Sequence, residues 1–285
     1  MSPKDSKKPN IKVSSQQLDS LRVKQGDKMH PSHVATDVSW DLDEKATKRA
    51  TKELYAEILE LQERLYAEKK QSILVVLQAM DAAGKDSTIR KLTSHMNVQG
   101  ARVQSFGKPT KLELSHDFLW RIHDKMPAKG EVVLFNRSHY EDVLIVKVHG
   151  WCSDEVLERR YEHINNMEAL AADNGTKIIK FMLNISPEYQ LTRFKNRLDN
   201  PGKNWKFNPD DLDERKHWGD YMTAFSDVFT RCSTEMAPWY LIPAEQRWLR
   251  DYLVARVLHD TLVEMNPQYP EPDYDSVAFT SDSIS

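Results

Sequence analysis

Short continuous runs of apolar residues alternate along this chain with longer stretches in which apolar residues recur every three or four positions. Residues 72–78 (SILVVLQ), 131–135 (EVVLF) and 176–185 (TKIIKFMLNI) are the strongest runs. Each is short for a helix and suits a strand that is buried on both faces. Residues 102–106 and 239–242 form two weaker runs of the same kind. The runs therefore predict five strands.

The longer stretches have the spacing of amphipathic helices. In residues 43–70, four leucine and isoleucine side chains recur at intervals of four, three and four, which places them on one helix face. Further helices are expected at residues 85–96, 112–123, 153–172 and 245–265, and beginning at Pro187 and Pro209, the last running toward residue 231. Strands that alternate with helices and lack tight hairpin signals predict a parallel α/β sheet.

Composition divides the chain into three parts. Residues 1–38 are mixed in character without a clear period, and we expect an N-terminal extension that is loose or draped on the core. Residues 39–265 contain all the predicted strands and form the expected main domain. Residues 266–285 are rich in Pro and Asp and predict a disordered tail.

The balance of charge and the low cysteine count exclude several classes of protein. Lys and Arg total 40 and Asp and Glu total 43, so the formal net charge of −3 gives no overall basic field for nucleic acid. No apolar run approaches the ~20 residues that span a bilayer, and residues 1–10 lack the apolar segment of a secretory signal. Two cysteines, Cys152 and Cys232, cannot form a disulfide framework. We expect a cytoplasmic protein that binds neither membranes nor nucleic acid.

The sequence that follows the first strong run has the character of a phosphate-binding loop. Residues 78–88 read QAMDAAGKDST, so a buried strand leads through a tight loop and Gly84-Lys85 into a helix. Backbone N–H groups in such a loop form an anion nest, and the lysine reaches terminal phosphate oxygens. The match to the usual motif is incomplete, because Ala79 replaces its first glycine and Asp86 its Ser or Thr. Asp81 would repel a polyanion unless it holds Mg²⁺ that bridges the phosphates.

A second group of polar residues follows the 131–135 run, as the sequence NRSHYED at positions 136–142. Ligands of parallel sheets bind at the carboxyl ends of the strands, so we expect this segment beside the loop. Arg137 offers a planar fork for phosphate. Glu141 and Asp142 offer carboxylates for a metal, ribose or base, although either acid could instead interact with the N-terminal end of a helix dipole.

A third group is basic and surrounds the predicted end of a helix at residues 193–206, RFKNRLDNPGKNWK. Arg193 and Arg197 are four residues apart and share a helix face, and Pro201-Gly202 then breaks the helix. A cationic helix end and loop can close over phosphates as a lid and keep water out of the transfer. The alternative is an ordinary solvated charged face.

Taken together and in order, these segments resemble the polyphosphate kinase 2 family over about residues 38–265. The matching pieces are LQAMDAAGKDSTIRK, VQSFGKPT, HDFLWRIH, FNRSHYEDVL, RLDNPGKNWKF and APWYLIPAEQRW. The resemblance implies a three-layer α/β/α P-loop kinase fold, with a mostly parallel sheet and a helical lid at about residues 190–220. It also implies reversible, Mg²⁺-dependent, in-line transfer of the terminal phosphoryl group of inorganic polyphosphate to AMP or ADP, with Mn²⁺ as an alternative ion and guanine nucleotides as alternative substrates.

The resemblance implies roles for individual residues. The catalytic residues are then Asp81, Lys85, Arg137 and Glu141. The phosphate chain is bound by Ala82, Ala83, Gly84, Lys85, Asp86, Ser87, Arg137, Arg193, Arg197 and Lys206. The nucleotide contacts Asp81, Phe106, Lys108, Asn136, Arg137 and Glu141. The metal ligands are Asp81 and Asn136. Many members of the family have Asp at the latter position, and since Asn136 is neutral, the alternative is that Asp81 or Glu141 carries the metal instead. The resemblance also implies that the protein assembles as a homotetramer built as a dimer of dimers.

Alternatives remain for the nucleotide that accepts the phosphoryl group and for the compound that donates it. The run His139-Tyr140-Glu141-Asp142 resembles the class III branch, which is associated with phosphorylation of both AMP and ADP. We expect Arg90, Lys108 and Lys111 to extend the cationic groove, and the nucleotide to lie near residues 116–123, where aromatic side chains contact the base or simply pack in the core. Two rival functions are an ATP-dependent nucleoside monophosphate kinase and a non-catalytic polyanion-binding protein.

Overall fold

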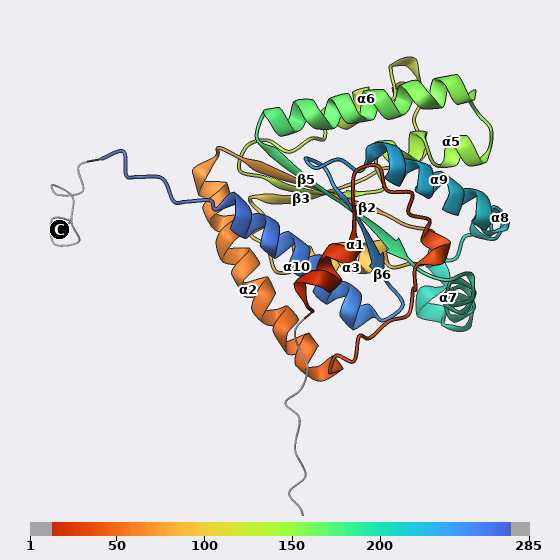
Figure 1. Ribbon diagram of the computed structural model, residues 1–285, viewed down its shortest axis with the longest axis horizontal. Coiled ribbons are helices and arrows are strands. Elements are labelled where there is room, and N and C mark those ends of the chain that lie inside the picture. The colour runs from red at the N-terminus through yellow and green to blue at the C-terminus, as the bar shows by residue number, and fades with distance from the viewer. Residues whose placement is uncertain (1–12, 275–285) are drawn as a thin grey trace, which may run out of the picture.

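The structure, a computed structural model, describes residues 13–274, and the predicted N-terminal extension and tail lie partly outside them. Six strands form one sheet in the order β1-β6-β5-β2-β4-β3 (Figure 1). Neighbours pair in parallel except β1 and β6, which are antiparallel. All five predicted strands are confirmed to within one residue at each end. The strands are β1 Arg22–Val23, β2 Ser72–Gln78, β3 Ala101–Ser105, β4 Val132–Asn136, β5 Thr176–Asn184 and β6 Trp239–Pro243.

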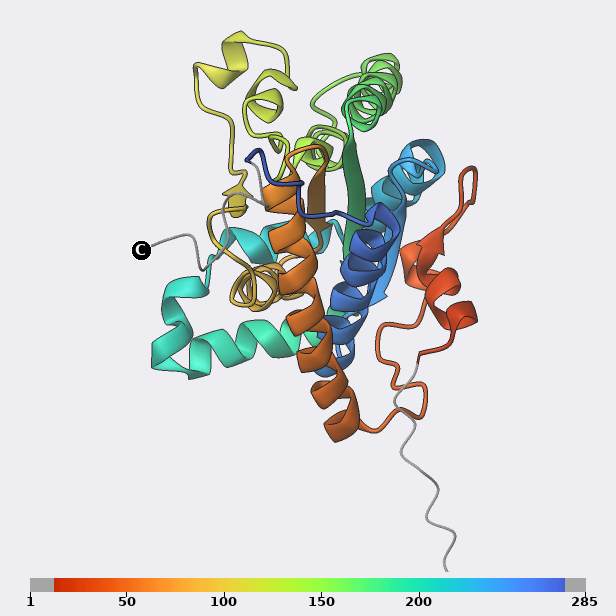
Figure 2. The same ribbon diagram turned by 90° about the vertical axis from the view of Figure 1, so that its left-hand side faces the viewer.

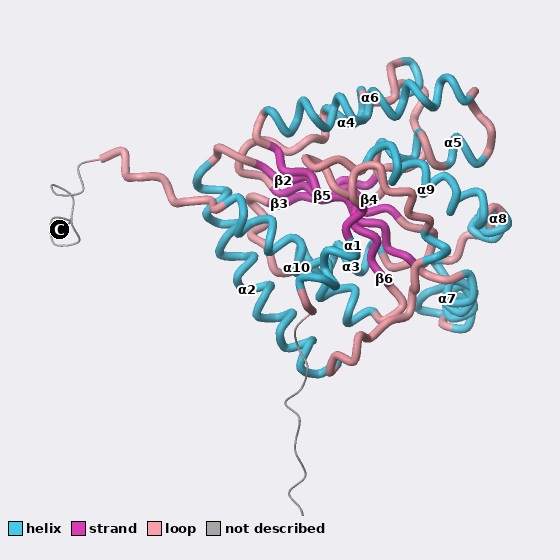
Figure 3. Tube along the Cα trace, viewed as in Figure 1, coloured by secondary structure: helices cyan, strands magenta, loops and turns pink. Residues whose placement is uncertain are grey.

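Helices cover both faces of the sheet, so the three-layer α/β/α fold is confirmed (Figure 3). Alternate side chains of one strand enter different cores: Ile73 and Val75 of β2 pack with α2 (Glu44–Glu68) and α10 (Arg247–Met265). Leu74 and Val76 point to the opposite face, which is covered by α6 (Asp154–Asp173) and α9 (Trp218–Cys232). This two-sided burial explains why the central strands are continuously apolar.

Several helices lie where the sequence predicts them. Two of them have a side-chain cap: the Asp43 carboxylate accepts the N–H of Ala46 before α2, and the Ser186 hydroxyl accepts the N–H of Tyr189 before α7 (Pro187–Asp199), which begins at the predicted proline. The shorter helices are α1 (Ser15–Leu21), α3 (Lys85–Thr93), α4 (Trp120–His123), α5 (Ile145–Val148) and α8 (Asp210–Lys216), with 3₁₀ turns η1 (Pro31–His33), η2 (Glu113–Ser115), η3 (His139–Asp142) and η4 (Pro201–Lys206).

Two helix predictions are wrong in their continuity. Residues 112–123 form η2 and then α4, with an extended residue at His116 between them. Leu112 and Leu114 are 62% and 69% exposed, so the stretch has no continuous apolar face to bury, and the Asp117 carboxylate accepts the N–H of Leu119 where the chain turns again. The helix predicted from Pro209 toward residue 231 is divided at His217 into α8 and α9.

The first described residues are attached to the main sheet. β1 adds an antiparallel edge to β6, and Val23 is buried in the core. The Ser233 hydroxyl donates to the carbonyl of Val23 over 2.6 Å, and the amide nitrogen of Asn184 donates to the carbonyl of Pro31 over 3.1 Å. Residues 13–38 therefore lie draped on the ends of β5 and β6. The elements that make these contacts are too short to produce a hydrophobic period in the sequence.

A segment comprising α7, η4 and α8 projects from the end of β5 and is hereafter called the α7–α8 segment (residues 187–216). In Figure 2 it is the turquoise arm that extends to the lower left. Within residues 13–274, no helix is long and apolar enough to cross a membrane.

Candidate active site

The loop between β2 and α3 adopts the turn that an anion nest requires. Ala82 and Gly84 both have left-handed backbone angles, with φ of 65° and 109°, and α3 begins at the next residue, Lys85. Alternation of left-handed and right-handed residues turns successive N–H groups toward one side of the chain. The N-terminal end of the nine-residue helix α3 adds its partial positive charge at the same place. The loop therefore has the backbone of a phosphate site.

The Lys85 side chain folds back over this loop. It is 9% exposed, and its Nζ donates to the carbonyl of Ala79 over 2.8 Å. Burial lowers the pKa of the Lys85 ammonium, an effect that the carboxylate of Asp81 opposes. An ammonium held at the start of the loop, in a partly desolvated place, attracts a phosphate more strongly than one in water.

Asp81, Arg137 and Glu141 form a line of alternating charge beside the loop. The guanidinium Nη2 of Arg137 donates to Oδ1 of Asp81 over 3.0 Å, and its Nη1 lies 3.9 Å from Oε2 of Glu141. Burial alone would raise the pKa of Asp81, but Lys85 and Arg137 hold that pKa below its ordinary value. Asp81 is therefore ionised at neutral pH, and Glu141 raises the pKa of Arg137 further.

The end of β4 supplies the other wall of the site. The side-chain nitrogen of Asn136 donates to Oδ1 of Asp86 over 2.8 Å, and Arg137 adopts a left-handed φ of 62° that turns its side chain toward the loop. Phe106, which follows β3, packs edge-on against Phe135 with ring centroids 4.8 Å apart. The expectation that the carboxyl ends of β2 and β4 bring these two motifs together is confirmed by the Asp81–Arg137 and Asp86–Asn136 contacts.

The α7–α8 segment contacts the loop directly. The amide nitrogen of Gln190 on α7 donates to the carbonyl of Asp81 over 3.0 Å. Arg197, further along the same helix, donates through Nη1 to the carbonyl of Lys206 and to Oδ2 of Asp211, both over 3.0 Å. Arg197 thus connects different parts of the α7–α8 segment to one another, and Gln190 connects the segment to the phosphate-binding loop.

These elements enclose one strongly cationic pocket of about 410 Å³. Eight cationic side chains and only two carboxylates line it, although the whole chain carries a net charge of −3. The lining residues are Asp81, Ala82, Gly84, Lys85, Asp86, Ser87, Arg90, Ser105, Phe106, Asn136, Arg137, Arg193, Asn196, Arg197, Lys203, Lys206 and Arg247.

Most of the predicted site residues therefore lie together, with a few exceptions. Ala83 is buried rather than lining the pocket, and Lys108 and Lys111 are absent from its lining. Glu141 lines a smaller cavity of about 60 Å³ that shares Asp81 and Arg137 with the main pocket and is also lined by Tyr221 and Phe225 of α9.

Sequence reasoning missed several residues of the pocket. Lys203 and Asn196 belong to the basic stretch already identified, and their side chains are joined by a 2.7 Å hydrogen bond from Nζ to Oδ1. Arg247 lies at the start of α10, about 110 residues beyond the second motif, and although it belongs to the matching segment APWYLIPAEQRW, nothing in that segment gives it a role in the site. Only the folded chain places it beside the loop.

The region around residues 116–123 forms a separate hollow. This pocket of about 660 Å³ is lined by His116, Asp117, Phe118, Leu119 and His123 together with side chains of α6. His116 stacks on Trp120 with ring centroids 4.2 Å apart, and Leu119 is buried in the core. It shares no lining residue with the cationic pocket.

Comparison with known proteins gives consistent matches. A sequence profile of the family described as Polyphosphate kinase 2 matches residues 41–270. An AMP/ADP-polyphosphate phosphotransferase of Meiothermus ruber is 51% identical over 213 residues, covering 75% of this chain and 80% of the relative. An ADP-polyphosphate phosphotransferase of Rhodopseudomonas palustris is 40% identical, covering 78% and 83%. The crystal structure of Polyphosphate Kinase 2 from Arthrobacter aurescens TC1 superposes with a TM-score of 0.86 at 41% identity, covering 91% of this chain and 93% of that one.

Proposed function

This chain belongs to the polyphosphate kinase 2 family, and from that premise we propose that it is a phosphotransferase that moves the terminal phosphoryl group of inorganic polyphosphate to AMP or ADP, reversibly. The observation that carries the proposal is the cationic pocket at the phosphate-binding loop. Polyphosphate is a linear anion with about one charge per unit, and a groove of fixed cations binds it by replacing its counterions. Eight cations around 410 Å³ suit such a chain.

Each residue has a role that follows from its position. Backbone amides of residues 82–87 and the Lys85 ammonium bind the terminal phosphate, while Arg193, Lys203 and Lys206 bind the chain beyond it. Arg137, turned toward the loop and paired with Asp81, neutralises charge on the group in transit. Phosphoryl transfer needs positioning and charge neutralisation more than covalent chemistry, so no covalent phospho-enzyme is expected.

The residues present are compatible with a divalent metal ion. Mg²⁺ is held in such sites by one or two carboxylates together with phosphate oxygens and water, and Asp81 and Asp86 place two carboxylates in the pocket, with the side-chain oxygen of Asn136 nearby. Asp81 remains ionised in spite of its burial, because Lys85 and Arg137 lower its pKa. Asp81 and Asn136 are the residues that would hold Mg²⁺, or Mn²⁺, and the bound ion would supply neutralisation of phosphate charge.

The nucleotide belongs beside the same loop. Phe106 and Asn136 line the pocket, and Glu141 lies just across Arg137 in the smaller cavity. Acceptance of both AMP and ADP is supported by the name of the Meiothermus ruber relative and by the HYED run. We extend the nucleotide contacts to Lys108, leave guanine nucleotides as a second acceptor class, and assign the role of a closing lid to residues of about 190–220.

We also propose that the protein works in the cytoplasm, which its two cysteines favour, and that it is a homotetramer, a dimer of dimers, as the family resemblance implies. Light scattering of the protein as it elutes from a size-exclusion column measures the mass of the assembly directly. A monomer or dimer at working concentration would contradict the tetramer without affecting the proposed reaction.

The identity of the phosphoryl donor decides the function. Purified protein is incubated with Mg²⁺, AMP and long-chain polyphosphate, without ATP, and the nucleotides are separated by chromatography. We expect ADP first and ATP afterwards. Absence of products here, with activity when ATP is the donor, would instead identify an ATP-dependent nucleoside monophosphate kinase. Binding of polyphosphate without turnover would identify a polyanion-binding protein.

A further inference from the structure

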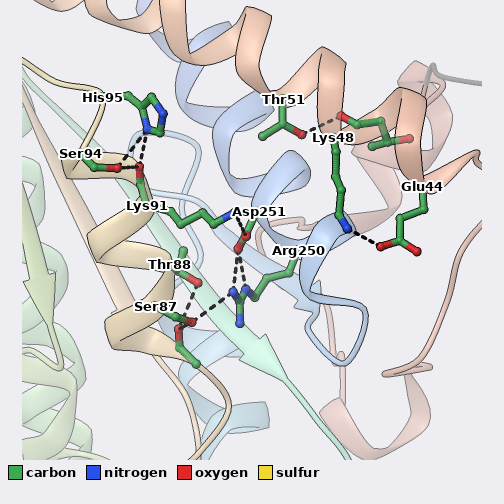
Figure 4. A network of polar contacts seen from close by, with 12 residues as sticks. Glu44, Lys48, Thr51, Ser87, Thr88, Lys91, Ser94, His95, Arg250 and Asp251 are labelled. Atoms are coloured by element: carbon green, nitrogen blue, oxygen red, sulfur yellow. Dashed lines mark hydrogen bonds and ion pairs between the residues drawn. The ribbon is translucent and has the colours of Figure 1, made fainter.

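A buried ion pair on α10 lies directly behind the phosphate-binding loop. Arg250 is 2% exposed, and its Nε and Nη2 donate to Oδ1 of Asp251 over 3.0 and 2.7 Å. Figure 4 shows the pair between α10 and α3, with contacts that continue to Ser87 and Lys91. Neither residue lines the cationic pocket, and the proposed transfer uses neither of them.

The guanidinium of Arg250 holds the loop through two contacts. Its Nη2 donates to the Ser87 hydroxyl over 3.2 Å, and that hydroxyl donates onward to the carbonyl of Gly84 over 2.8 Å. Its Nη1 lies 3.4 Å from the carbonyl of Ala83. The carbonyl of Ala83 is thus held on the side of Arg250, while that of Gly84 also accepts the N–H of Thr88 within α3 over 3.0 Å. Because the peptide group is planar and trans, the N–H of Gly84, which is bonded to the carbonyl carbon of Ala83, points away from the guanidinium.

The fit between Arg250 and Gly84 is close enough to explain the glycine. A Cβ on Gly84 would lie 2.2 Å from Nη1 of Arg250, which is too short for any contact between these atoms. Two features therefore require glycine at position 84: its φ of 109°, and the guanidinium of Arg250 that lies behind it. Asp251 fixes the fork and also reaches α3, where the Nζ of Lys91 lies 3.3 Å from its Oδ2.

We propose that Arg250, oriented by Asp251, is a positioning residue that sets the conformation of the phosphate-binding loop and thereby the affinity of the site for the polyphosphate end. The proposal rests on the proposed function for its substrate. It assigns to Arg250 a part in phosphate binding although this residue does not line the cationic pocket. It also gives Ser87 a structural duty, as the relay between Arg250 and the carbonyl of Gly84.

The test compares Arg250→Lys with Arg256→Lys. Lysine keeps the charge of Arg250 but loses the planar fork, so Ser87 and Asp251 cannot both be contacted in the same geometry. Arg256 lies on the same helix, and its Nε contacts Asp260 over 2.8 and 2.9 Å, away from the loop. We expect the KM for polyphosphate to rise about tenfold or more in Arg250→Lys, the scale of one hydrogen bond to a charged group, with an unchanged KM for AMP. Arg256→Lys should change neither.

Hydrogen exchange supplies a readout that needs no turnover. Amides of residues 82–88 should exchange faster in Arg250→Lys than in the wild type, while the central strands remain protected. A wild-type protein without polyphosphate-dependent transfer would remove the proposed function, yet faster exchange in this loop would still support the positioning role. A normal KM for polyphosphate and normal exchange in Arg250→Lys would overturn that role alone, as would an equal rise in both KM values.

Ser87→Ala is the milder second variant, and it leaves the buried pair intact. If Ser87 relays the contact from Arg250, the effects of Ser87→Ala and Arg250→Lys on the KM for polyphosphate should fall short of their sum in the double variant. Fully additive effects would contradict the relay, because they would show that the two residues act on the phosphate chain independently.

Discussion

The segment that follows β4 divides into two chemically different halves. Asn136 and Arg137 face the cationic pocket, where positive charges outnumber carboxylates by eight to two. His139 and Tyr140, two and three residues later, are completely buried on the opposite side. Adjacent residues of one motif thus serve an open site and a closed cluster, and a polar motif alone does not tell which residues touch the substrate.

The closed cluster satisfies its own charges. Nζ of Lys180 donates to Oε2 of Glu168 over 2.5 Å, to the Tyr140 hydroxyl over 2.8 Å and to the carbonyl of Cys232 over 2.7 Å. Oε1 of Glu168 accepts the Tyr140 hydroxyl over 2.9 Å and lies 3.2 Å from Nε2 of His139. All three donors of the ammonium are used. Burial favours the uncharged form of His139 and lowers its pKa.

The difference lies in what completes each set of charges. In the closed cluster, one ammonium and one carboxylate compensate each other inside the protein. In the pocket the excess of cations remains uncompensated until an anion arrives, which is the state expected of a binding site and costly for a core. Removal of a charge should therefore reduce stability at the cluster and reduce activity at the pocket.

The largest effect is expected from Lys180→Met. It leaves the Glu168 carboxylate buried without its ammonium, and breaking a buried pair in this way costs about 3–5 kcal/mol of the free energy of unfolding. Urea unfolding measures this loss, while the activity of the molecules that remain folded should be nearly normal. Lys177→Met on the same strand is the matched control, because Lys177 pairs with an exposed glutamate and should cost about 0–1 kcal/mol.

A double variant decides whether charge is the cause. Lys180→Met combined with Glu168→Met removes both ions, and the pair should be less destabilised than Lys180→Met alone. If the double variant is worse than the single one, shape rather than charge compensation holds this region together. A large fall in the activity of Lys180→Met without a fall in its stability would contradict the distinction between a closed cluster that stabilises the fold and a pocket that binds substrate.

The sequence predicts the elements of this fold well because their signals are local. Strands buried on both faces are continuously apolar, and Pro187 marks the start of α7. The prediction of one helix over residues 112–123 is wrong because only the second half of the stretch has a core to pack against: Leu112 and Leu114 are exposed, whereas Leu119 and Ile122 are buried. The prediction omits β1 because two residues carry no period.

The site divides in the same way. Gly84-Lys85 and Arg137 are predictable because their neighbours in the sequence form recognisable motifs. The closed cluster is not predictable, because it joins η3, α6 and β5, which are distant in sequence. The contacts between Arg250 on α10 and the phosphate-binding loop are not predictable either, because more than 160 residues separate them. The left-handed angles of Ala82 and Arg137 are also beyond prediction, since neither residue type favours them.

The second effect in size is loss of a pocket charge, in Asp81→Asn or Lys85→Ala. Each should lower kcat by about 10²–10³ or more, the range for single groups that stabilise developing charge, and should leave the thermal midpoint close to that of the wild type. Transfer from polyphosphate to AMP measures this directly. Lys129→Ala, an exposed lysine in the loop before β4, is the control with full activity. Near-normal turnover in either variant would refute the assignment of catalysis to the loop.

Asp142 lies where the two halves meet and should give a smaller effect that depends on pH. Its carboxylate lies 3.9 Å from Nη2 of Arg121 and 3.8 Å from Nη1 of Arg160, and burial, which these cations only partly offset, raises its pKa to about 6. Between the unfolded pKa of about 3.9 and this value, the folded protein binds more protons than the unfolded one. The contribution of Asp142 to stability is therefore fully present below the unfolded pKa and is lost as the pH rises through about 6.

Asp142→Asn removes this dependence. The free energy of unfolding of the variant, minus that of the wild type, should increase by about 2–3 kcal/mol as the pH rises from about 4 to about 7, because a tenfold difference in proton affinity between the folded and unfolded states corresponds to about 1.4 kcal/mol. Urea unfolding at several pH values across this range measures the difference. Asp173→Asn, at the exposed end of α6, should show no such trend. If the difference in free energy of unfolding between Asp142→Asn and the wild type does not change with pH, burial does not raise the pKa of Asp142.

The smallest effect is expected from Lys203→Ala in the α7–α8 segment. Lys203 lines the pocket but is only one of eight cations, and its Nζ also contacts Oδ1 of Asn196 over 2.7 Å. We expect the KM for polyphosphate to rise a few-fold, on the order of 1 kcal/mol, with kcat unchanged. The slope of log affinity against log salt should fall by about one, as for the loss of one phosphate contact. Lys216→Ala, whose side chain is 74% exposed and pairs with Asp213 outside the pocket, should leave that slope unchanged. An unchanged slope in Lys203→Ala would show that Lys203 does not contact the polyphosphate chain. It would also contradict the inference that each uncompensated charge of the cationic pocket, unlike the charges of the closed cluster, is available to bind an anion.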